Sequence, residues 1–206
     1  IRMRMHGPEV NDKIYTYNQG TALGASLEIA LALRDDVGLS HDEPIDSFEF
    51  SERADASMFY ITHIRSIIKG VALHLATPQG VIVSPEHESG EGDGGLFKGI
   101  LARYLADVAV RLPEDSNENI ATKKIAARLV LQSAESLWSH RLEVDGLPIF
   151  AAEWTDDARL PHNYGIGPSS ISEAVGLVRI DERDLSVQLS GWMLLEAAAR
   201  VEAALK

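Results

Sequence analysis

One run of apolar residues, Phe97–Leu112, constrains the fold of this chain more than any other feature of the sequence. Apolar side chains recur in it at intervals of three and four residues, as they do along the buried face of an α-helix. Pro113 follows directly and ends the pattern, because proline cannot continue a helix. The spacing therefore predicts a helix over residues 97–112.

Two more helices are predicted before this run. The same spacing of apolar residues is found over 21–34 and over 61–75. Gly38 supplies a stop signal after the first of them, and Pro78 breaks the second. The stretch 39–55 between them is polar and contains proline, so we expect a long loop there.

Three helices are expected after the run. Asp115, followed three residues later by Glu118, resembles a capping box and predicts the start of a helix that reaches about His140. A short helix is predicted over 169–178, and a long one within 185–206. Six amphipathic helices joined by loops predict an all-α protein, built from antiparallel helical hairpins that pack in layers.

Strand signals are scarce. Short apolar runs at Val81–Val83 and Leu147–Phe150 are bounded by Gly or Pro. They predict at most a small hairpin or a strand at the rim of the domain. A chain of 206 residues is long enough for one domain with a core, or for a large part of one.

The charge of the chain argues against two classes of partner. Lys and Arg number 19 against 31 Asp and Glu, which gives a net charge of −12. Such a chain repels nucleic-acid phosphates and anionic membrane surfaces. No apolar run is long enough to cross a bilayer, so we also expect no membrane insertion.

The potential metal ligands are not spaced as a site requires. His63 and His74 are eleven residues apart, too far along a helix to share one ion. The acidic, glycine-rich segment 86–95 does not match the EF-hand pattern, and its acids would repel nucleotide phosphates. We therefore expect no metal and no cofactor, and interpret this segment as a solvated loop.

The segment Tyr15–Gly20 reads Tyr-Thr-Tyr-Asn-Gln-Gly at the start of a predicted helix. The carboxamides of Asn18 and Gln19 can both donate and accept, which suits neutral sugar hydroxyls, and the ring of Tyr17 offers a flat apolar face. Alternatively, Asn18 or Gln19 caps the helix and the tyrosines pack in the core. The spacing alone leaves both interpretations open.

A second segment, Leu96–Leu105, reads Leu-Phe-Lys-Gly-Ile-Leu-Ala-Arg-Tyr-Leu. The two segments in this order resemble glycoside hydrolase family 76, the endo-α-1,6-mannanases. Ala134–Trp138, Trp154 and Pro168–Ser170 are similar to later segments of the same family. The resemblance covers residues 15–178.

This resemblance implies an (α/α)6 toroid with a cleft for mannan. It also implies retaining hydrolysis of an internal α-1,6-mannosidic bond by two carboxylates. The family's catalytic pair of adjacent aspartates lies upstream of the Tyr-Asn-Gln-Gly motif, and none of Ile1–Lys13 reproduces it. We therefore expect about half of the toroid, the C-terminal half, with no catalytic residue. Its partners would be carbohydrate and the missing N-terminal half.

The resemblance assigns substrate binding to six residues: Tyr17, Asn18, Gln19, Asp93, Lys98 and Trp154. The first three would hold sugar hydroxyls or orient the missing aspartates. The charged pair would line the cleft or pin the acidic loop, and the tryptophan would stack on a pyranose ring or lie buried in the ring of helices. The chain's own aspartate pairs, at 35–36 and 156–157, are interpreted as a solvated helix end and a rim position.

Two other classes of function remain open. One is a carbohydrate-binding relative without catalysis. The other is a different α/α-toroid enzyme, such as a sugar epimerase or an unsaturated-glucuronyl hydrolase. That second class would depend on histidines, among them His63, His74 and His87, or on a differently placed acid.

Overall fold

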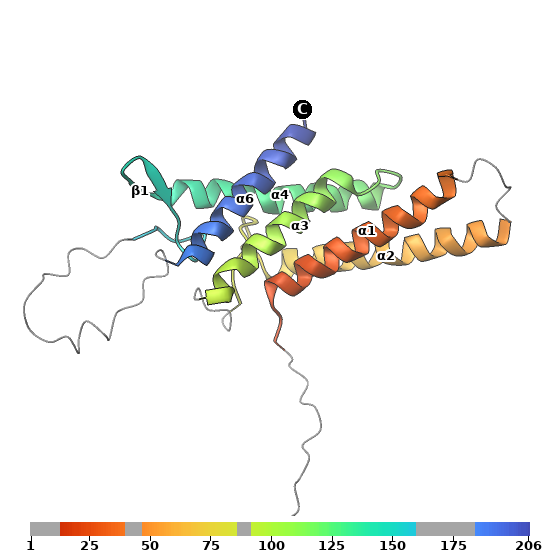
Figure 1. Ribbon diagram of the computed structural model, residues 1–206, viewed down its shortest axis with the longest axis horizontal. Coiled ribbons are helices and arrows are strands. Elements are labelled where there is room, and N and C mark those ends of the chain that lie inside the picture. The colour runs from red at the N-terminus through yellow and green to blue at the C-terminus, as the bar shows by residue number, and fades with distance from the viewer. Residues whose placement is uncertain (1–12, 40–46, 86–91, 160–183) are drawn as a thin grey trace, which may run out of the picture.

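The computed structural model describes residues 13–39, 47–85, 92–159 and 184–206. These residues form five α-helices, one 3-10 helix and a two-stranded hairpin (Figure 1). In chain order they are α1 (Thr16–Leu39), α2 (Ser47–His74), η1 (Gly92–Leu96), α3 (Phe97–Arg111), α4 (Asn117–Ser139), β1 (Leu142–Val144), β2 (Leu147–Ile149) and α6 (Leu185–Ala204). The predicted all-α class is confirmed.

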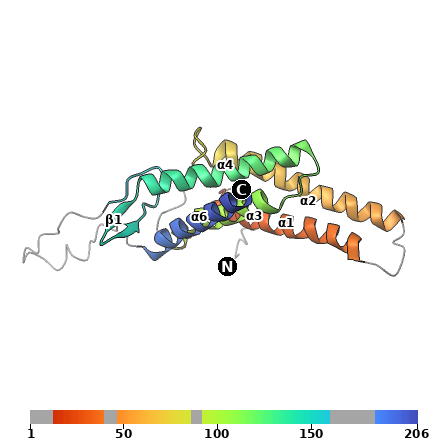
Figure 2. The same ribbon diagram turned by 90° about the horizontal axis from the view of Figure 1, so that it is seen from above.

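The helices form two layers (Figure 2). Helices α1, α3 and α6 run side by side in one direction, and we call them the three-helix layer. Helices α2 and α4 pack against them from one side and run in the opposite direction; we call them the two-helix layer. The pairs α1–α2 and α3–α4 are thus the antiparallel hairpins that the sequence predicts.

The core lies between the two layers. Most of its side chains come from the predicted apolar stripes, and burying one Leu or Ile side chain contributes about 1.5–3 kcal/mol. The largest fully buried side chains are Trp154, Phe150, Leu23, Leu27, Ile61, Ile64, Ile68, Ile82, Leu101, Leu105, Leu112 and Leu137. Every described α-helix except α6 supplies at least one of these large side chains.

Two glycines set the spacing within the three-helix layer. A Cβ on Gly20 of α1 would lie 2.9 Å from the Cα of Leu101 in α3, and a Cβ on Gly99 of α3 would lie 2.8 Å from the Cα of Ser190 in α6. The Gly99 amide also donates to the Ser190 Oγ, at 2.9 Å. Since the contacts are backbone against backbone, only glycine fits at either position.

Ion pairs reinforce the same layer at its surface. Arg111 of α3 pairs with Glu28 of α1, and its hydrogen bond holds the pKa of the Glu28 carboxyl below its usual range. Arg200 of α6 pairs with Asp107 of α3, at 2.6 Å. Each neighbouring pair of helices in the three-helix layer is therefore joined by a backbone contact and by an ion pair.

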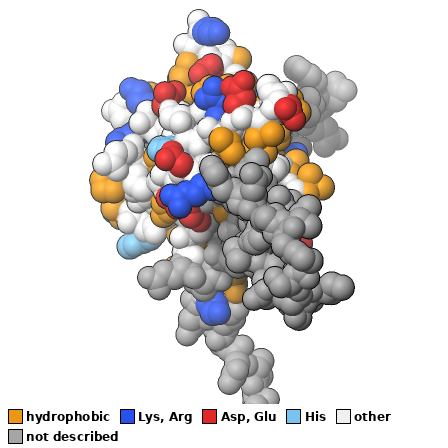
Figure 3. Space-filling view, turned by 90° about the vertical axis from the view of Figure 1, so that its left-hand side faces the viewer, with side chains coloured by type: hydrophobic (Ala, Val, Ile, Leu, Met, Phe, Trp, Pro, Cys, Tyr) orange, Lys and Arg blue, Asp and Glu red, His pale blue; other side chains and the backbone are white. Residues whose placement is uncertain are grey.

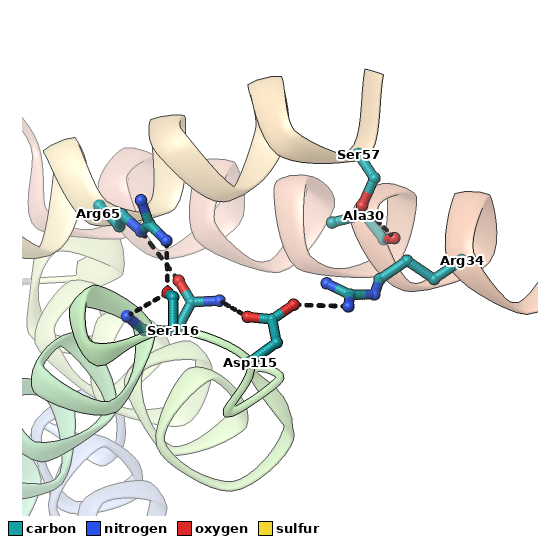
Figure 4. Close-up of polar contacts among 7 residues, drawn as sticks. Ala30, Arg34, Ser57, Arg65, Asp115 and Ser116 are labelled. Carbon is teal, nitrogen blue, oxygen red and sulfur yellow. Dashed lines mark hydrogen bonds and ion pairs between the residues drawn. The ribbon is translucent and has the colours of Figure 1, made fainter. Parts of the chain in front are cut away.

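A polar network joins the first hairpin to the start of α4 (Figure 4). Arg34 of α1 pairs with Asp115 at 2.5 Å, and Asp115 also accepts from the Asn119 side chain at 2.8 Å. Arg65 of α2 donates to Asn119 Oδ1 and to Ser116 Oγ, both at 2.9 Å. Burial acts to raise the pKa of Asp115, but the hydrogen bond and charge of Arg34 and the bond from Asn119 outweigh it, so this pKa lies below its usual range.

The first two helices are longer than predicted. Helix α1 begins at Thr16 rather than Thr21, and α2 begins at Ser47 rather than Ile61, inside the stretch 39–55 expected to be a loop. Most side chains between Ser51 and Asp55 are exposed. A helical segment that buries so little has no apolar stripe, so periodicity cannot reveal it.

The start of α4 is also capped differently. Ser116, not Asp115, is the N-cap, and its Oγ accepts from the Asn119 amide at 3.1 Å. The predicted helices over 97–112 and within 185–206 are confirmed as α3 and α6, while the helix predicted over 169–178 lies outside the described residues.

The scarcity of strands is confirmed. In the described part of the chain, β1 and β2 form one antiparallel hairpin, and Ile82 makes an isolated bridge with Ala76 where a strand over 81–83 was predicted. The hairpin turn places Asp145 and Gly146 at positive φ, 51° and 77°. No helix among the described residues is long and apolar enough to span a membrane.

The glycine contacts lead to a paired prediction. Replacing Gly99 with Ala should lower the free energy of unfolding by about 1–3 kcal/mol, because the new methyl group meets the Ser190 backbone. Gly70 in α2 has no heavy atom within 4 Å of the added Cβ, so Gly70→Ala should raise stability by about 0.5–1 kcal/mol. Urea unfolding measures the free energy of unfolding of both variants. Equal changes in the two would contradict the close approach of α3 and α6 at Gly99.

The Arg34–Asp115 pair leads to a pH prediction. Because the pKa of Asp115 is lower in the folded than in the unfolded protein, the ionised carboxylate stabilises the fold above pH ~4, and that contribution is lost as the pH falls. Asp115→Asn should therefore lower the free energy of unfolding by less than about 1 kcal/mol near neutral pH, because the side chains of Arg34 and Asp115 are both over a third exposed. Below pH ~3 the substitution should leave the free energy of unfolding unchanged. Urea unfolding across this range measures the difference, with Asp157→Asn at an exposed position as the control variant.

Candidate functional site

The three helices of the three-helix layer all begin at the same end of the molecule, which we call the N-terminal end (Figure 1). The 3-10 helix η1 leads into α3 there and packs against the start of α6, so closely that a Cβ on Gly95 would collide with Ser186. Figure 3 looks onto this end, where hydrophobic and acidic side chains lie side by side.

Three aromatic rings join α1 to α3 at this end. The rings of Tyr17 and Phe97 lie 4.4 Å apart between centroids, and Tyr15 lies 6.0 Å from each of them. Tyr15 meets Phe97 edge-on, at 90°. Such contacts are favourable for aromatic pairs and fix the angle at which the chain enters α1.

A buried lysine lies beside this cluster. Lys98 is 3% exposed, donates to the Ala152 carbonyl at 2.7 Å and pairs with Glu153 at 3.0 Å. Its ammonium also lies 5.0 Å from the centre of the Trp154 ring, a cation–π contact. Lys98 thus attaches the segment after the hairpin to the start of α3.

The six residues predicted to bind substrate divide by exposure. Asn18 and Asp93 are exposed, Tyr17 and Gln19 are half-buried, and Lys98 and Trp154 are buried. Thr16–Gly20 of the first motif lie in the first turns of α1 rather than before the helix, and Tyr15 directly precedes it.

The structure brings two of these six into direct contact, Lys98 and Trp154. Trp154 is 1% exposed, which matches the buried position considered as the alternative to sugar stacking. The binding roles themselves stay predictions. Sequence reasoning missed Tyr15 and Phe97 as parts of this end, although both lie within the two quoted motifs.

The two aspartate pairs of the chain lie on different elements, one within α1 and one in the segment after the hairpin. Asp156 and Asp157 are exposed, and Asp156 accepts from the neighbouring Thr155 hydroxyl. The pair at 35–36 was predicted to follow a helix, but lies within α1, which continues to Leu39. Within the described ranges, no group of three or more His, Asp or Glu side chains could hold a metal ion.

Comparison with solved structures identifies what this arrangement is similar to. The GH76A α-1,6-mannanase from Salegentibacter sp. HEL1_6 matches with 28% identity and a TM-score of 0.57, over 92% of this chain and 41% of that chain. The resemblance to glycoside hydrolase family 76 is confirmed. The chain spans about two fifths of the length of this family 76 enzyme, and the predicted fold, about half of an α/α toroid, is confirmed with it.

Two further structures of the same family 76 enzyme match. Both are inactive variants in which two consecutive aspartates are replaced. One is in complex with α-1,6-mannotriose and matches at 28% identity with a TM-score of 0.56; the other is in complex with α-1,6-mannotetrose and matches at 27% with 0.57. No model of a protein family matches the sequence, and no curated protein matches it.

The environment of Lys98 leads to a stability prediction. Lys98→Met keeps an unbranched side chain one atom shorter but leaves the Ala152 carbonyl without this donor and Glu153 without this cation, so it should lower the free energy of unfolding by about 1–3 kcal/mol. Lys69→Met, at an exposed position of α2, should change stability by less than about 0.5 kcal/mol. Urea unfolding tests both variants. An unchanged free energy of unfolding in Lys98→Met would show that the contacts of Lys98 do not stabilise the fold.

Proposed function

We propose that this chain forms one part of the wall of a mannan-binding cleft in a glycosidase that hydrolyses α-1,6-mannan. The observation that carries the proposal is the match over 92% of the chain to an α-1,6-mannanase, two structures of which contain α-1,6-manno-oligosaccharides. The exposed residues at the N-terminal end support it, because carboxamide and carboxylate groups suit neutral sugar hydroxyls.

The proposed reaction is retaining hydrolysis by two carboxylates. One attacks the anomeric carbon, while the other protonates the leaving oxygen and then activates water, and the two lie about 5–5.5 Å apart. In this proposal both carboxylates come from outside the 206 residues. The reason is that the match covers only 41% of an enzyme that is inactive when two consecutive aspartates are replaced.

Within the cleft, Asn18 is the described residue best placed to contact substrate. Its side chain is exposed in the first turn of α1, and only its backbone carbonyl is used, as the acceptor from Thr21 at 3.2 Å. Asp93, exposed in η1 beside the start of α3, would accept a second sugar hydroxyl. Both residues lie at the N-terminal end, on different helices.

The test is hydrolysis of α-1,6-mannan by the natural polypeptide that contains this chain. We expect shorter α-1,6-manno-oligosaccharides by chromatography, with the α-anomer formed first in the NMR spectrum, and no cleavage of β-1,4-mannan or α-1,4-glucan. Binding of α-1,6-mannan without cleavage would replace the hydrolase by the non-catalytic carbohydrate-binding alternative. Absence of both binding and cleavage would overturn the proposal.

A substitution tests the role of Asn18. Asn18→Ala should weaken the affinity for α-1,6-mannotetrose about tenfold, a loss of ~1.4 kcal/mol, because one pair of hydrogen bonds to sugar is removed. Isothermal titration calorimetry measures the affinity, and urea unfolding should show no loss of stability. Thr62→Ala, exposed on α2 in the other layer, is the control and should bind as wild type does.

A further inference from the structure

We propose that Trp192 of α6 is a stacking platform for a sugar ring of the same mannan chain that Asn18 contacts. The inference rests on the proposed function and extends the cleft from α1 across α3 to α6. It assigns a binding role to a residue outside the motifs from which the family resemblance was drawn.

Trp192 belongs to an apolar stripe that no described element covers. Leu185, Leu189 and Trp192 are 79%, 47% and 53% exposed, and their spacing of four and three residues places them on one face of α6. The face that packs in the core is a different one, and it carries Leu194 and Val201. A line of large exposed side chains on a helix marks a binding surface more often than chance exposure.

The indole ring is held in place from behind. Phe150 meets it edge-on, with centroids 6.2 Å apart and planes at 77°. The adjacent Gly191 leaves no space for a side chain, because a Cβ there would lie 2.4 Å from the Phe150 ring. Gln188 accepts from the Phe150 amide at 3.0 Å and donates to its carbonyl at 2.9 Å, which ties the end of the hairpin to α6.

This support has a consequence for binding. A ring that is fixed before the ligand arrives loses little conformational freedom when the ligand binds. The apolar face of a pyranose ring can then lie on the exposed indole face, as aromatic side chains allow. Glu196, exposed one turn further along α6, offers carboxylate oxygens to the sugar hydroxyls.

The glycine contacts place Trp192 at the height of Asn18. Gly20, two residues after Asn18, meets Leu101 of α3, and Gly99, two residues before Leu101, meets Ser190 of α6. The three helices run in one general direction (Figure 1), and Asn18 and Trp192 each lie within two residues of these contacts.

Asn18 and Trp192 therefore lie on helices that are two helix spacings apart across the layer. An oligosaccharide spans that distance, while a single sugar does not. The occupant that fits is thus one extended chain of mannosyl units that crosses α3, on which Arg103 is exposed.

The experiment compares Trp192→Ala, Trp192→Phe and Trp138→Ala in the natural polypeptide. Trp138 is the matched control: it is 44% exposed, but lies on α4 in the other layer, under the Arg141 guanidinium at 4.0 Å. We expect Trp192→Ala to weaken α-1,6-mannotetrose binding about tenfold by calorimetry, and Trp192→Phe to restore most of the affinity. Trp138→Ala should bind as wild type does, and all three variants should elute as wild type does.

The outcomes separate the two proposals. Wild-type affinity in Trp192→Ala, while Asn18→Ala is impaired, would overturn the platform and leave the proposed function intact. A change in oligomeric state in Trp192→Ala with unchanged sugar affinity would show that the stripe contacts protein instead, and would also overturn the platform. If the unaltered protein bound no α-1,6-manno-oligosaccharide, both proposals would fall.

Discussion

Backbone contact at two glycines determines how the rest of this structure is arranged. Helices that pack through side chains lie about 8–10 Å apart and can slide by a turn. At Gly20 and Gly99 the neighbouring backbone comes within the reach of a single Cβ, so α1, α3 and α6 are fixed in one register. The helix starts, the aromatic cluster and the buried Lys98 all meet at one end because these contacts align them.

Much of the fold could be predicted from the sequence, and the failures share one cause. Helix α3 has a complete apolar stripe and a proline directly after it, so both of its ends were predicted to within one residue. Most side chains of α2 between Ser51 and Asp55 are exposed, so this stretch has no apolar stripe to detect. At the start of α4 the sequence offers two candidate N-caps, Asp115 and Ser116. Ser116 is the N-cap, while Asp115 accepts from Arg34, which is distant in sequence.

The candidate site was less predictable because its contacts join distant segments. The two motifs indicated the correct end of the molecule, since Tyr17 and Phe97 meet there. The sequence could not show that Lys98 and Trp154 are buried together, because that depends on the path of the chain after the hairpin. Trp192 was missed, although a signal existed: Leu185 and Leu189 lie on the same helical face, away from the Leu194 stripe.

The buried ammonium of Lys98 has a chemical consequence of its own. An amine that is 3% exposed cannot react with an acylating reagent until the segment around Ala152–Trp154 moves away from the start of α3. Exposed lysines such as Lys69 have no such barrier. The rate at which Lys98 becomes labelled therefore reports local opening around the start of α3, separately from global unfolding.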